Sequence, residues 1–339
     1  MIRGEKVSRN IGVIARVNLT NHTTDIQHSE DYLKWLGGRG YGIDIILNEV
    51  DPQTDPMSEN NKIVIATGCF TGTTLPGSSR IEIVTKNAVN NGIAYSSGGG
   101  NFSPALKSSG FDAIIIEGKS DKPVYLNCNN GTVEIKDATH LWGKTTWETE
   151  DQIRKEYTNN NLSVLCIGPA GENQANIACT IIDKSHACAW GGNGGIMGSK
   201  NLKAVVANLT GDDSPIIKDK DKFKKTTDHY RWILQASEPS ARLKSGGTHA
   251  MAAAGGWSGN APTSVRNLQD GYWDPEKTTR NREEAIRKYE IKRSTCYNCT
   301  LSCLHYYKME KNGEYLEGEG MHANSVRGLG SNWDVDDPF

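Results

Sequence analysis

The sequence predicts an α+β fold, in which a β-rich N-terminal domain is followed by the start of an α-helical domain. Short apolar runs dominate the first 210 residues, and they do not alternate regularly with helical segments as a doubly wound sheet would require. The run Asn129-Asn130-Gly131 separates two of them and predicts a β-hairpin, because Asn and Gly tolerate positive φ. After Gly211 the chain becomes polar and then amphipathic with helical spacing.

The expected strands are short and rich in Ile and Val, which favour pleated, half-buried surfaces. The first two, separated by Thr20-Asn21-His22, are expected to form a hairpin. Three segments have helical spacing of apolar residues instead: 31–38, 41–50 and 145–157. The strand candidates are 11–19, 23–27, 62–68, 80–86, 112–118, 123–128, 132–138, 163–168, 177–183 and 202–208.

The pattern of apolar and polar residues changes near residue 210. This change predicts a β-rich domain over 1–210 and a partial helical domain over 211–339. A helix is expected where Phe223, Tyr230, Ile233 and Leu234 share one face. Residues 240–280 are rich in Gly, Ser and Asn and are expected to be irregular loops, and 281–294 is expected to be a helix.

Composition and charge exclude several classes of protein. The net charge is −2, so nothing indicates electrostatic capture of nucleic acid or of an anionic membrane. The sequence has no apolar stretch of about twenty residues, so no membrane span is expected. The N-terminus has no apolar region typical of a signal peptide, and clustered thiols suit metal binding better than disulfides, so a cytoplasmic location is expected.

Three of the eight cysteines form a C-x₂-C-x₃-C run: Cys296, Cys299 and Cys303. Thiolates at this spacing on a tight turn can reach adjacent irons of a [4Fe–4S] cube. Zinc sites normally use paired C-x₂-C units or added His, and no second pair occurs, but zinc and three buried free thiols remain alternatives. The other five cysteines lie in or beside strand candidates and are interpreted as small buried hydrophobes.

Four Gly-rich segments distinguish the first domain. Successive glycines let backbone N–H groups converge on an anion, and Arg39 and Arg80 could add bidentate donors to a phosphate. No segment matches a P-loop or the dinucleotide fingerprint. Each alone is interpreted as a turn, but together they indicate a large phosphate-bearing ligand. The segments are 37–42, 71–80, 96–101 and 190–195.

Several long strings give the chain a resemblance to the aldehyde ferredoxin oxidoreductase family over essentially its whole length. They are residues 67–80, 96–118 (SSGGGNFSPALKSSGFDAIIIEG), 166–173 (CIGPAGEN), 194–206 (GGIMGSKNLKAVV) and 296–303 (CYNCTLSC). The resemblance implies an N-terminal β domain that forms a base for a tungsten or molybdenum bis-pyranopterin, and a helical region that carries three cysteine ligands of a [4Fe–4S] cluster.

The resemblance also assigns roles to particular residues. Arg80 is expected to meet a pterin phosphate, and the carbonyls of Ser97 and Ala187 are expected to lie near a bridging Mg²⁺. Cys296, Cys299 and Cys303 are expected to bind iron. The positions expected to line the cofactor are Arg80, Ser97, Gly98, Gly99, His186, Ala187, Ala189 and Trp190.

The sequence departs from the family pattern at several points. His186 and Trp190 stand where the family usually has Arg. The family's presumed catalytic Glu falls on Asn324, which cannot act as a base. His322 is a candidate proton donor or acceptor, with a hydrogen-bonded structural His as the alternative. Family members are longer, so the fourth cluster cysteine and the second set of pterin contacts are expected beyond Phe339.

The expected function is that of a tungsten or molybdenum pterin oxidoreductase, which passes electrons from an aldehyde through the [4Fe–4S] cluster to ferredoxin or an Fe–S subunit. The resemblance allows a homodimer and a small-molecule substrate. Two alternatives remain: a divergent member that acts on an aryl-CoA or a hydroxy acid, or a truncated, non-catalytic cofactor or electron-transfer subunit.

Overall fold

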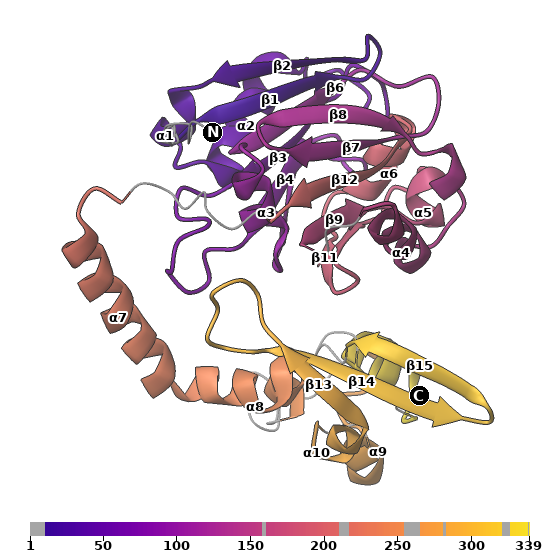
Figure 1. The fold of residues 1–339 in the computed structure, drawn as a ribbon. Helices are drawn as coiled ribbons and strands as arrows, with labels where there is room; N and C mark the ends of the chain where they lie inside the picture. The colour runs from indigo at the N-terminus through magenta and orange to yellow at the C-terminus, as the bar shows by residue number, and fades with distance from the viewer. Residues whose placement is uncertain are drawn as a thin grey trace. The chain divides into compact units, whose positions relative to one another are not determined.

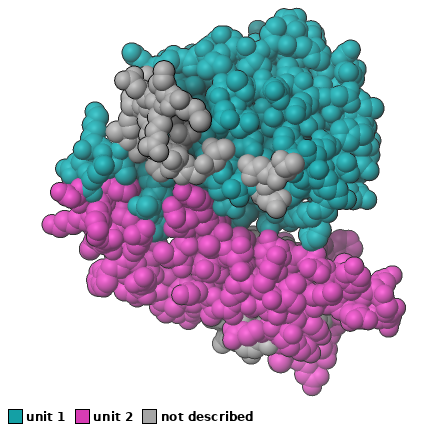
Figure 2. Space-filling view, viewed as in Figure 1, with its two compact units in different colours: residues 1–220 teal, residues 221–339 magenta. Residues whose placement is uncertain are grey.

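The structure is a computed structural model that describes residues 11–157, 161–209, 217–253, 265–280, 283–320, 326–337 and 339. It divides into two compact units, residues 1–220 and 221–339, which Figure 2 colours separately and which are described one at a time. His322 and Asn324 lie outside the described residues.

Unit 1 contains two mixed sheets of six strands each (Figure 1). The first has the order β2-β1-β6-β3-β4-β5, and the second has the order β11-β10-β9-β12-β7-β8. The strands of the first sheet are β1 (Val13–Asn18), β2 (Thr23–His28), β3 (Ile63–Thr67), β4 (Ile81–Lys86), β5 (Ile93–Gly98) and β6 (Ala113–Glu117). Those of the second are β7 (Val124–Asn129), β8 (Thr132–Asp137), β9 (Leu162–Cys166), β10 (Thr180–Ile182), β11 (His186–Cys188) and β12 (Leu202–Asn208).

The main core lies between the two sheets. Apolar side chains of both sheets, such as Ile65 and Val205, belong to one buried cluster. Helices α3 (Phe102–Ser108) and α6 (Asn193–Ser199) are buried at every position and contact strands of both sheets. Strands β3 and β12 are buried along their whole length, which explains why most of their residues are apolar. The buried Lys203 of β12 donates to the Lys144 carbonyl at 2.9 Å.

Helices α2 (Gly38–Glu49) and α4 (Thr146–Glu156) cover the outer faces of the sheets. Tyr41 and Ile46 of α2 pack on Val64 and Val84 of the first sheet, and Ile153 of α4 packs with strands of the second. Helix α4 begins with a capping box in which Thr145 and Glu148 bond each other's backbone N–H groups. The remaining short elements are α1 (Asp31–Lys34), η1 (Thr139–Leu141) and α5 (Pro169–Glu172).

The structure confirms the α+β fold class and both predicted hairpins, since β1 pairs with β2 and β7 with β8 in antiparallel register. Besides the short elements η1 and α5, four elements of unit 1 were not predicted: β5, β11, α3 and α6. They are short and rich in Gly, Ser and Ala, so they have no apolar periodicity to reveal them.

Unit 2 begins with α7 (Lys220–Ala236), which confirms the amphipathic helix predicted there. Two other expectations are wrong. Residues 240–280 are not all irregular, because α8 (Glu238–Ala253) and α9 (Pro275–Arg280) occupy part of the segment. The helix expected over 281–294 ends early: α10 (Glu283–Ile286) and η3 (Arg287–Tyr289) are followed by a strand, β13 (Glu290–Ser294).

The strand β13 exists because it finds partners later in the chain. It pairs antiparallel with β14 (Leu304–Lys311), which pairs with β15 (Glu314–Glu319). The cysteine run lies in the connection between β13 and β14. Long-range pairing therefore overrides the local helical preference of this segment. Two further short elements, η4 (Val326–Gly330) and η5 (Ser331–Trp333), follow. None of the described helices is both long enough and apolar enough to span a membrane.

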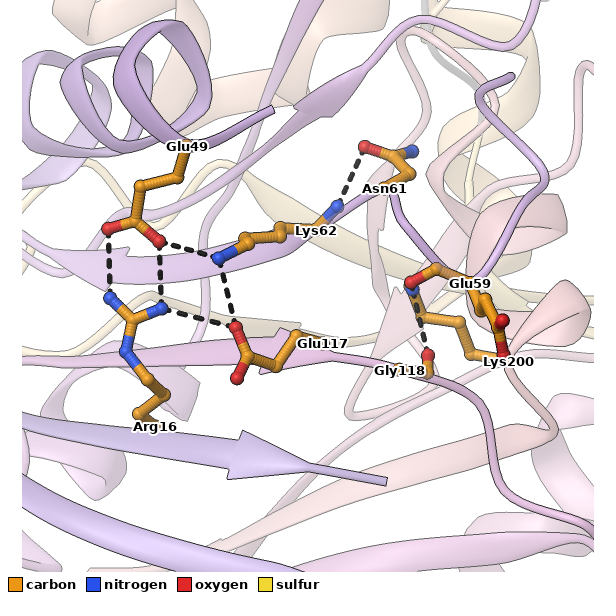
Figure 3. A network of polar contacts seen from close by, with 8 residues as sticks. All are labelled: Arg16, Glu49, Glu59, Asn61, Lys62, Glu117, Gly118 and Lys200. Carbon is orange, nitrogen blue, oxygen red and sulfur yellow. Dashed lines mark hydrogen bonds and ion pairs between the residues drawn. The ribbon is translucent and has the colours of Figure 1, made fainter. Parts of the chain in front are cut away.

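A polar network ties α2 to the outer face of the first sheet (Figure 3). Glu49 of α2 accepts two hydrogen bonds from Arg16 of β1, at 2.8 and 2.9 Å, and one from Lys62 at 2.6 Å. Lys62 also pairs with Glu117 of β6 at 2.9 Å. Nearby, the buried Lys200 donates to the carbonyls of Glu59 and Gly118, and burial lowers the pKa of its ammonium to about 8.

Glu49 makes stability depend on pH. Its hydrogen bonds from Arg16 lower its pKa to about 2 in the folded chain, so its contribution is complete above the unfolded pKa and is lost as the pH falls toward 2. We expect Glu49→Gln to lower the free energy of unfolding by about 1–2 kcal/mol at pH 7. In urea titrations, the difference from wild type should shrink between about pH 4.5 and pH 2.

The matched control is Glu30→Gln, because the exposed Glu30 carboxylate makes no hydrogen bond or ion pair among the described residues. Its effect should be close to zero at every pH. A Glu49→Gln effect that does not change with pH would show that the charge of Glu49 contributes nothing.

Candidate functional site

The structure brings β5 and β11, the edge strands of the two sheets, together. The backbone N–H of Trp190 donates to Ser96 Oγ at 3.1 Å, and the backbone N–H of Ala88 donates to the Gly191 carbonyl at 3.1 Å. Residues 95–100 and 186–191 are therefore neighbours, although they are far apart in the sequence. We call these residues, with Arg39, Arg80 and Glu82, the edge-strand site.

All four Gly-rich segments meet at this site. Gly37 forms a β-bridge with Gly68, which places the first segment beside the start of the second. Arg39 of the first segment donates to Ser97 Oγ of the third at 3.4 Å. Trp190 of the fourth contacts Ser96 of the third, as described above. Residues of Gly-rich segments that are far apart in the sequence thus lie close to one another in unit 1.

Several of these positions have to be glycine, because neighbouring atoms leave no room for a Cβ. A Cβ on Gly98 would lie 2.6 Å from Cys188 Sγ, and one on Gly100, at φ +89°, would lie 2.8 Å from His186 Cδ2. A Cβ on Gly191, at φ +85°, would lie 2.1 Å from Ala94 Cβ. These glycines thus serve first to let β5 and the β11 segment approach each other. Gly77, at φ +77°, is different because nothing lies within 4 Å of its Cβ direction.

Ser97 is the polar centre of the site. Its hydroxyl donates to Glu82, and its carbonyl accepts from Arg80 Nη1 at 3.5 Å. Arg39 Nε contacts Glu82 at 3.4 Å, and the Arg39 guanidinium lies 3.7 Å from the centroid of the Tyr95 ring. Sequence reasoning missed Glu82 and Tyr95, whose only signal was their alternation with Ile81 and Ile83 along β4 and with buried residues along β5.

Among the other predicted contact positions, Gly98 and Gly99 are buried, and the rest are at least partly exposed. Ala187 and Ala189 are exposed, Arg80 is exposed, and the Trp190 side chain is 61% exposed. His186 is half-buried beside Gly100. The site therefore presents backbone edges and two arginine side chains at the surface of unit 1.

The three cysteines of the C-x₂-C-x₃-C run form a separate candidate site in unit 2. All three are half-buried, and the Cys299 N–H donates to the Cys296 carbonyl at 3.0 Å, which folds the run into a tight turn. Burial raises the pKa of the Cys303 thiol, and the nearby Cys296 and Cys299 raise it further. Among the described residues, no three His, Cys, Asp or Glu side chains are placed to hold a single metal ion.

The remaining five cysteines lie in unit 1, where three are fully buried. Burial raises the pKa of Cys166 and of Cys188 to about 12, so these thiols are poor thiolate ligands. All eight cysteines are free of disulfides.

A buried polar group beside the cysteine run was not predicted. His305, two residues after Cys303, is 1% exposed and contacts Glu290 Oε2 through Nδ1 at 2.9 Å. Its Nε2 has no hydrogen-bond partner among the described residues. Only the tertiary structure reveals this pair, because Glu290 falls in the segment expected to be a helix.

The donor chemistry of both sites fits the groups that the resemblance implies. The edge-strand site offers guanidinium donors and glycine backbone, which suit an anionic cofactor. The cysteine turn offers three half-buried sulfurs within a short connection between β13 and β14. Each thiolate of a cube binds a different iron, so three thiols spread wider than a single-ion site are compatible with it.

The fold and the edge-strand site define a class of protein: two packed sheets whose glycine-rich edges meet at an arginine-bearing ligand site, followed by a three-cysteine unit. Residues 14–209 match the family described as "Aldehyde ferredoxin oxidoreductase, N-terminal domain", and residues 225–339 match "Aldehyde ferredoxin oxidoreductase, domains 2 & 3". The chain belongs to the aldehyde ferredoxin oxidoreductase family.

Individual relatives agree with this assignment. The chain is 36% identical over 331 residues to the tungsten-containing aldehyde ferredoxin oxidoreductase of Pyrococcus furiosus, which covers 97% of this chain and 53% of the relative. It is 36% identical over 317 residues to the aliphatic sulfonate oxidoreductase, WOR-like subunit, of the same organism, covering 86% of this chain and 48% of that one. The chain thus spans about half the length of the curated relatives that it matches.

A solved structure shares the fold. The active site complex BamBC of benzoyl coenzyme A reductase, in complex with 1,5-dienoyl-CoA, superimposes with a TM-score of 0.79 at 27% identity. The match covers 91% of this chain and 48% of that chain.

Proposed function

We propose that this chain forms the cofactor-binding part of a tungsten pterin oxidoreductase that oxidises aldehydes and passes the electrons to ferredoxin. The observation that carries the proposal is the meeting of β5 and β11, which brings the exposed Arg80, Ala187 and Trp190 together with Ser97 and the buried Gly98 and Gly99. A tungsten pterin supplies two-electron redox chemistry when it is bound.

The chain's own residues bind and orient the cofactor. Arg80 donates to a phosphate of the pterin, and the backbone of Ser97–Gly99 and of Ala187–Ala189 lines it, with the Ser97 and Ala187 carbonyls available to a Mg²⁺. His186 and Trp190 occupy positions where the family usually has Arg. Trp190, with an exposed indole, offers a flat apolar surface to a ring system there instead.

Cys296, Cys299 and Cys303 are proposed to bind a [4Fe–4S] cluster, which accepts electrons singly and delivers them to a ferredoxin-like partner. The tight turn over 296–299 and the half-buried sulfurs support this assignment. A cytoplasmic location accompanies it, in keeping with eight free thiols.

The test is metal and pterin analysis of the full natural protein, purified without oxygen. We expect tungsten, pterin and about four irons per chain, with viologen-linked aldehyde oxidation. Cys299→Ser should lower the iron content, whereas Cys128→Ser, which alters a buried thiol of unit 1, should leave it unchanged. Stoichiometric zinc without iron would contradict the cluster assignment.

A second candidate is oxidoreduction of a substrate other than an aldehyde. Asn324 stands where the family has its acidic residue, and the chain is similar to proteins named for an aliphatic sulfonate and for a coenzyme A thioester. Tungsten, pterin and iron at full occupancy without aldehyde turnover would favour this candidate.

A further inference from the structure

The edge-strand site contains a second arginine, Arg39, and not all of its N–H donors bond to other residues that the structure describes. Arg39 lies in the first turn of α2, and α2 packs on β4 and β5. A guanidinium carries five N–H donors. Within the described residues, Arg39 uses Nε toward Glu82 and Nη2 toward Ser97, and Nη1 donates to nothing.

The surroundings of Arg39 fix its orientation without neutralising it well. The Tyr95 ring supports one face of the guanidinium, 3.7 Å from Cζ to the ring centroid. The contact with Glu82 is long, at 3.4 Å, and the same carboxylate accepts the Ser97 hydroxyl. The Arg39 side chain remains 45% exposed.

Arg39 and Arg80 converge on one residue. Arg39 contacts the side-chain oxygen of Ser97, and Arg80 contacts its carbonyl oxygen. Two cations and the single carboxylate of Glu82 leave an excess positive charge at the site. Two oriented guanidinium groups with spare donors are the arrangement that binds phosphate oxygens bidentately.

We propose that Arg39 is a second anion-binding side chain of the edge-strand site, which clamps the phosphate-bearing part of the cofactor together with Arg80. The inference rests on the proposed function, since it concerns the same ligand. Glu82 and Tyr95 are positioning residues that hold Arg39 in place. Arg39 supplies a cation to the site, where His186 and Trp190 replace arginines of the family pattern.

The test measures pterin per chain and the rate of pterin release after dilution, both on the full natural protein. Arg39→Ala should release the cofactor about 10- to 100-fold faster, the loss expected for one charge-assisted bidentate contact. Arg39→Lys should rescue it partly, because the charge remains and the fork is lost. Arg39→Gln, which keeps the length without the charge, should resemble Arg39→Ala.

The control is Arg266→Ala, which removes an exposed arginine paired with Asp270 in unit 2 and should not change pterin release. Thermal unfolding of each variant shows that it is folded. Unchanged release in Arg39→Ala, with loss in Arg80→Ala, would overturn the role of Arg39 and leave the proposed function standing. Unchanged pterin in both variants, or no pterin in the wild type, would overturn the proposed function itself.

Discussion

Replacing Asp112 with alanine should lower the free energy of unfolding by about 3–5 kcal/mol, the cost of leaving one partner of a buried ion pair alone. Asp112 is fully buried, and its Oδ1 lies 2.8 Å from Nζ of Lys107, whose side chain is 2% exposed. Its Oδ2 accepts the N–H groups of Gly12 and Val13. The single carboxylate therefore joins α3 to β1 and β6.

Urea unfolding monitored by circular dichroism measures this effect. Asp112→Asn should be milder than Asp112→Ala, because an amide oxygen can still accept one backbone hydrogen bond. The double variant Lys107→Met/Asp112→Ala should recover part of the loss, since no unpaired buried charge remains. Equal losses in the single and double variants would show that the charge pair contributes nothing beyond packing.

The second large effect is expected at Gly191, where alanine should cost about 2–4 kcal/mol and disrupt the edge-strand site. At φ +85° any side chain adds strain of about 1 kcal/mol or more. A Cβ would also lie 2.1 Å from Ala94 Cβ on β5, which adds overpacking of about 1–3 kcal/mol. The segment that carries Ala187 and Trp190 would then be displaced from β5, so pterin content should fall as well.

Gly143→Ala is the matched control, because Gly143 has the same φ of +85° but nothing lies within 4 Å of its Cβ direction. It should show the strain alone, about 1 kcal/mol, with full pterin content. Removing the opposing methyl group in Ala94→Gly/Gly191→Ala should restore part of the pterin content. If Gly143→Ala and Gly191→Ala behave alike, the contact between the two edge strands does not position the site.

The local sequence was sufficient to predict an element where the residues of that element alone show a strand or turn pattern. Strands β3 and β12 are buried on both faces, so the apolar residues Ile63–Ala66 and Ala204–Ala207 were recognisable as strands. The hairpin of β7 and β8 was predicted from Asn130 and Gly131, and both residues have positive φ in the structure. These elements depend on neighbours within a few residues, which a sequence pattern can report.

Prediction failed where long-range contacts decided the conformation. Residues 290–294 have helical periodicity but form β13, because β14 provides an antiparallel partner. Strands β5 and β11 carry almost no apolar pattern, yet they are ordered by pairing with β4 and β10 and by contact with each other. Such contacts join residues far apart in the chain, so no window of sequence contains them.

The sequence by itself determined the family of this protein, the glycine-rich segments and the three-cysteine run, and it made Arg80 a candidate cofactor contact. Only the tertiary structure decided which glycines face neighbouring side chains, as Gly98 and Gly191 do, and which are open, as Gly77 is. It alone placed Arg39 beside Ser97 and His305 beside Glu290. The physical reason is that the type of a residue determines which hydrogen bonds and ion pairs it can form. The pairing of strands distant in the sequence decides which partner lies close enough to form them.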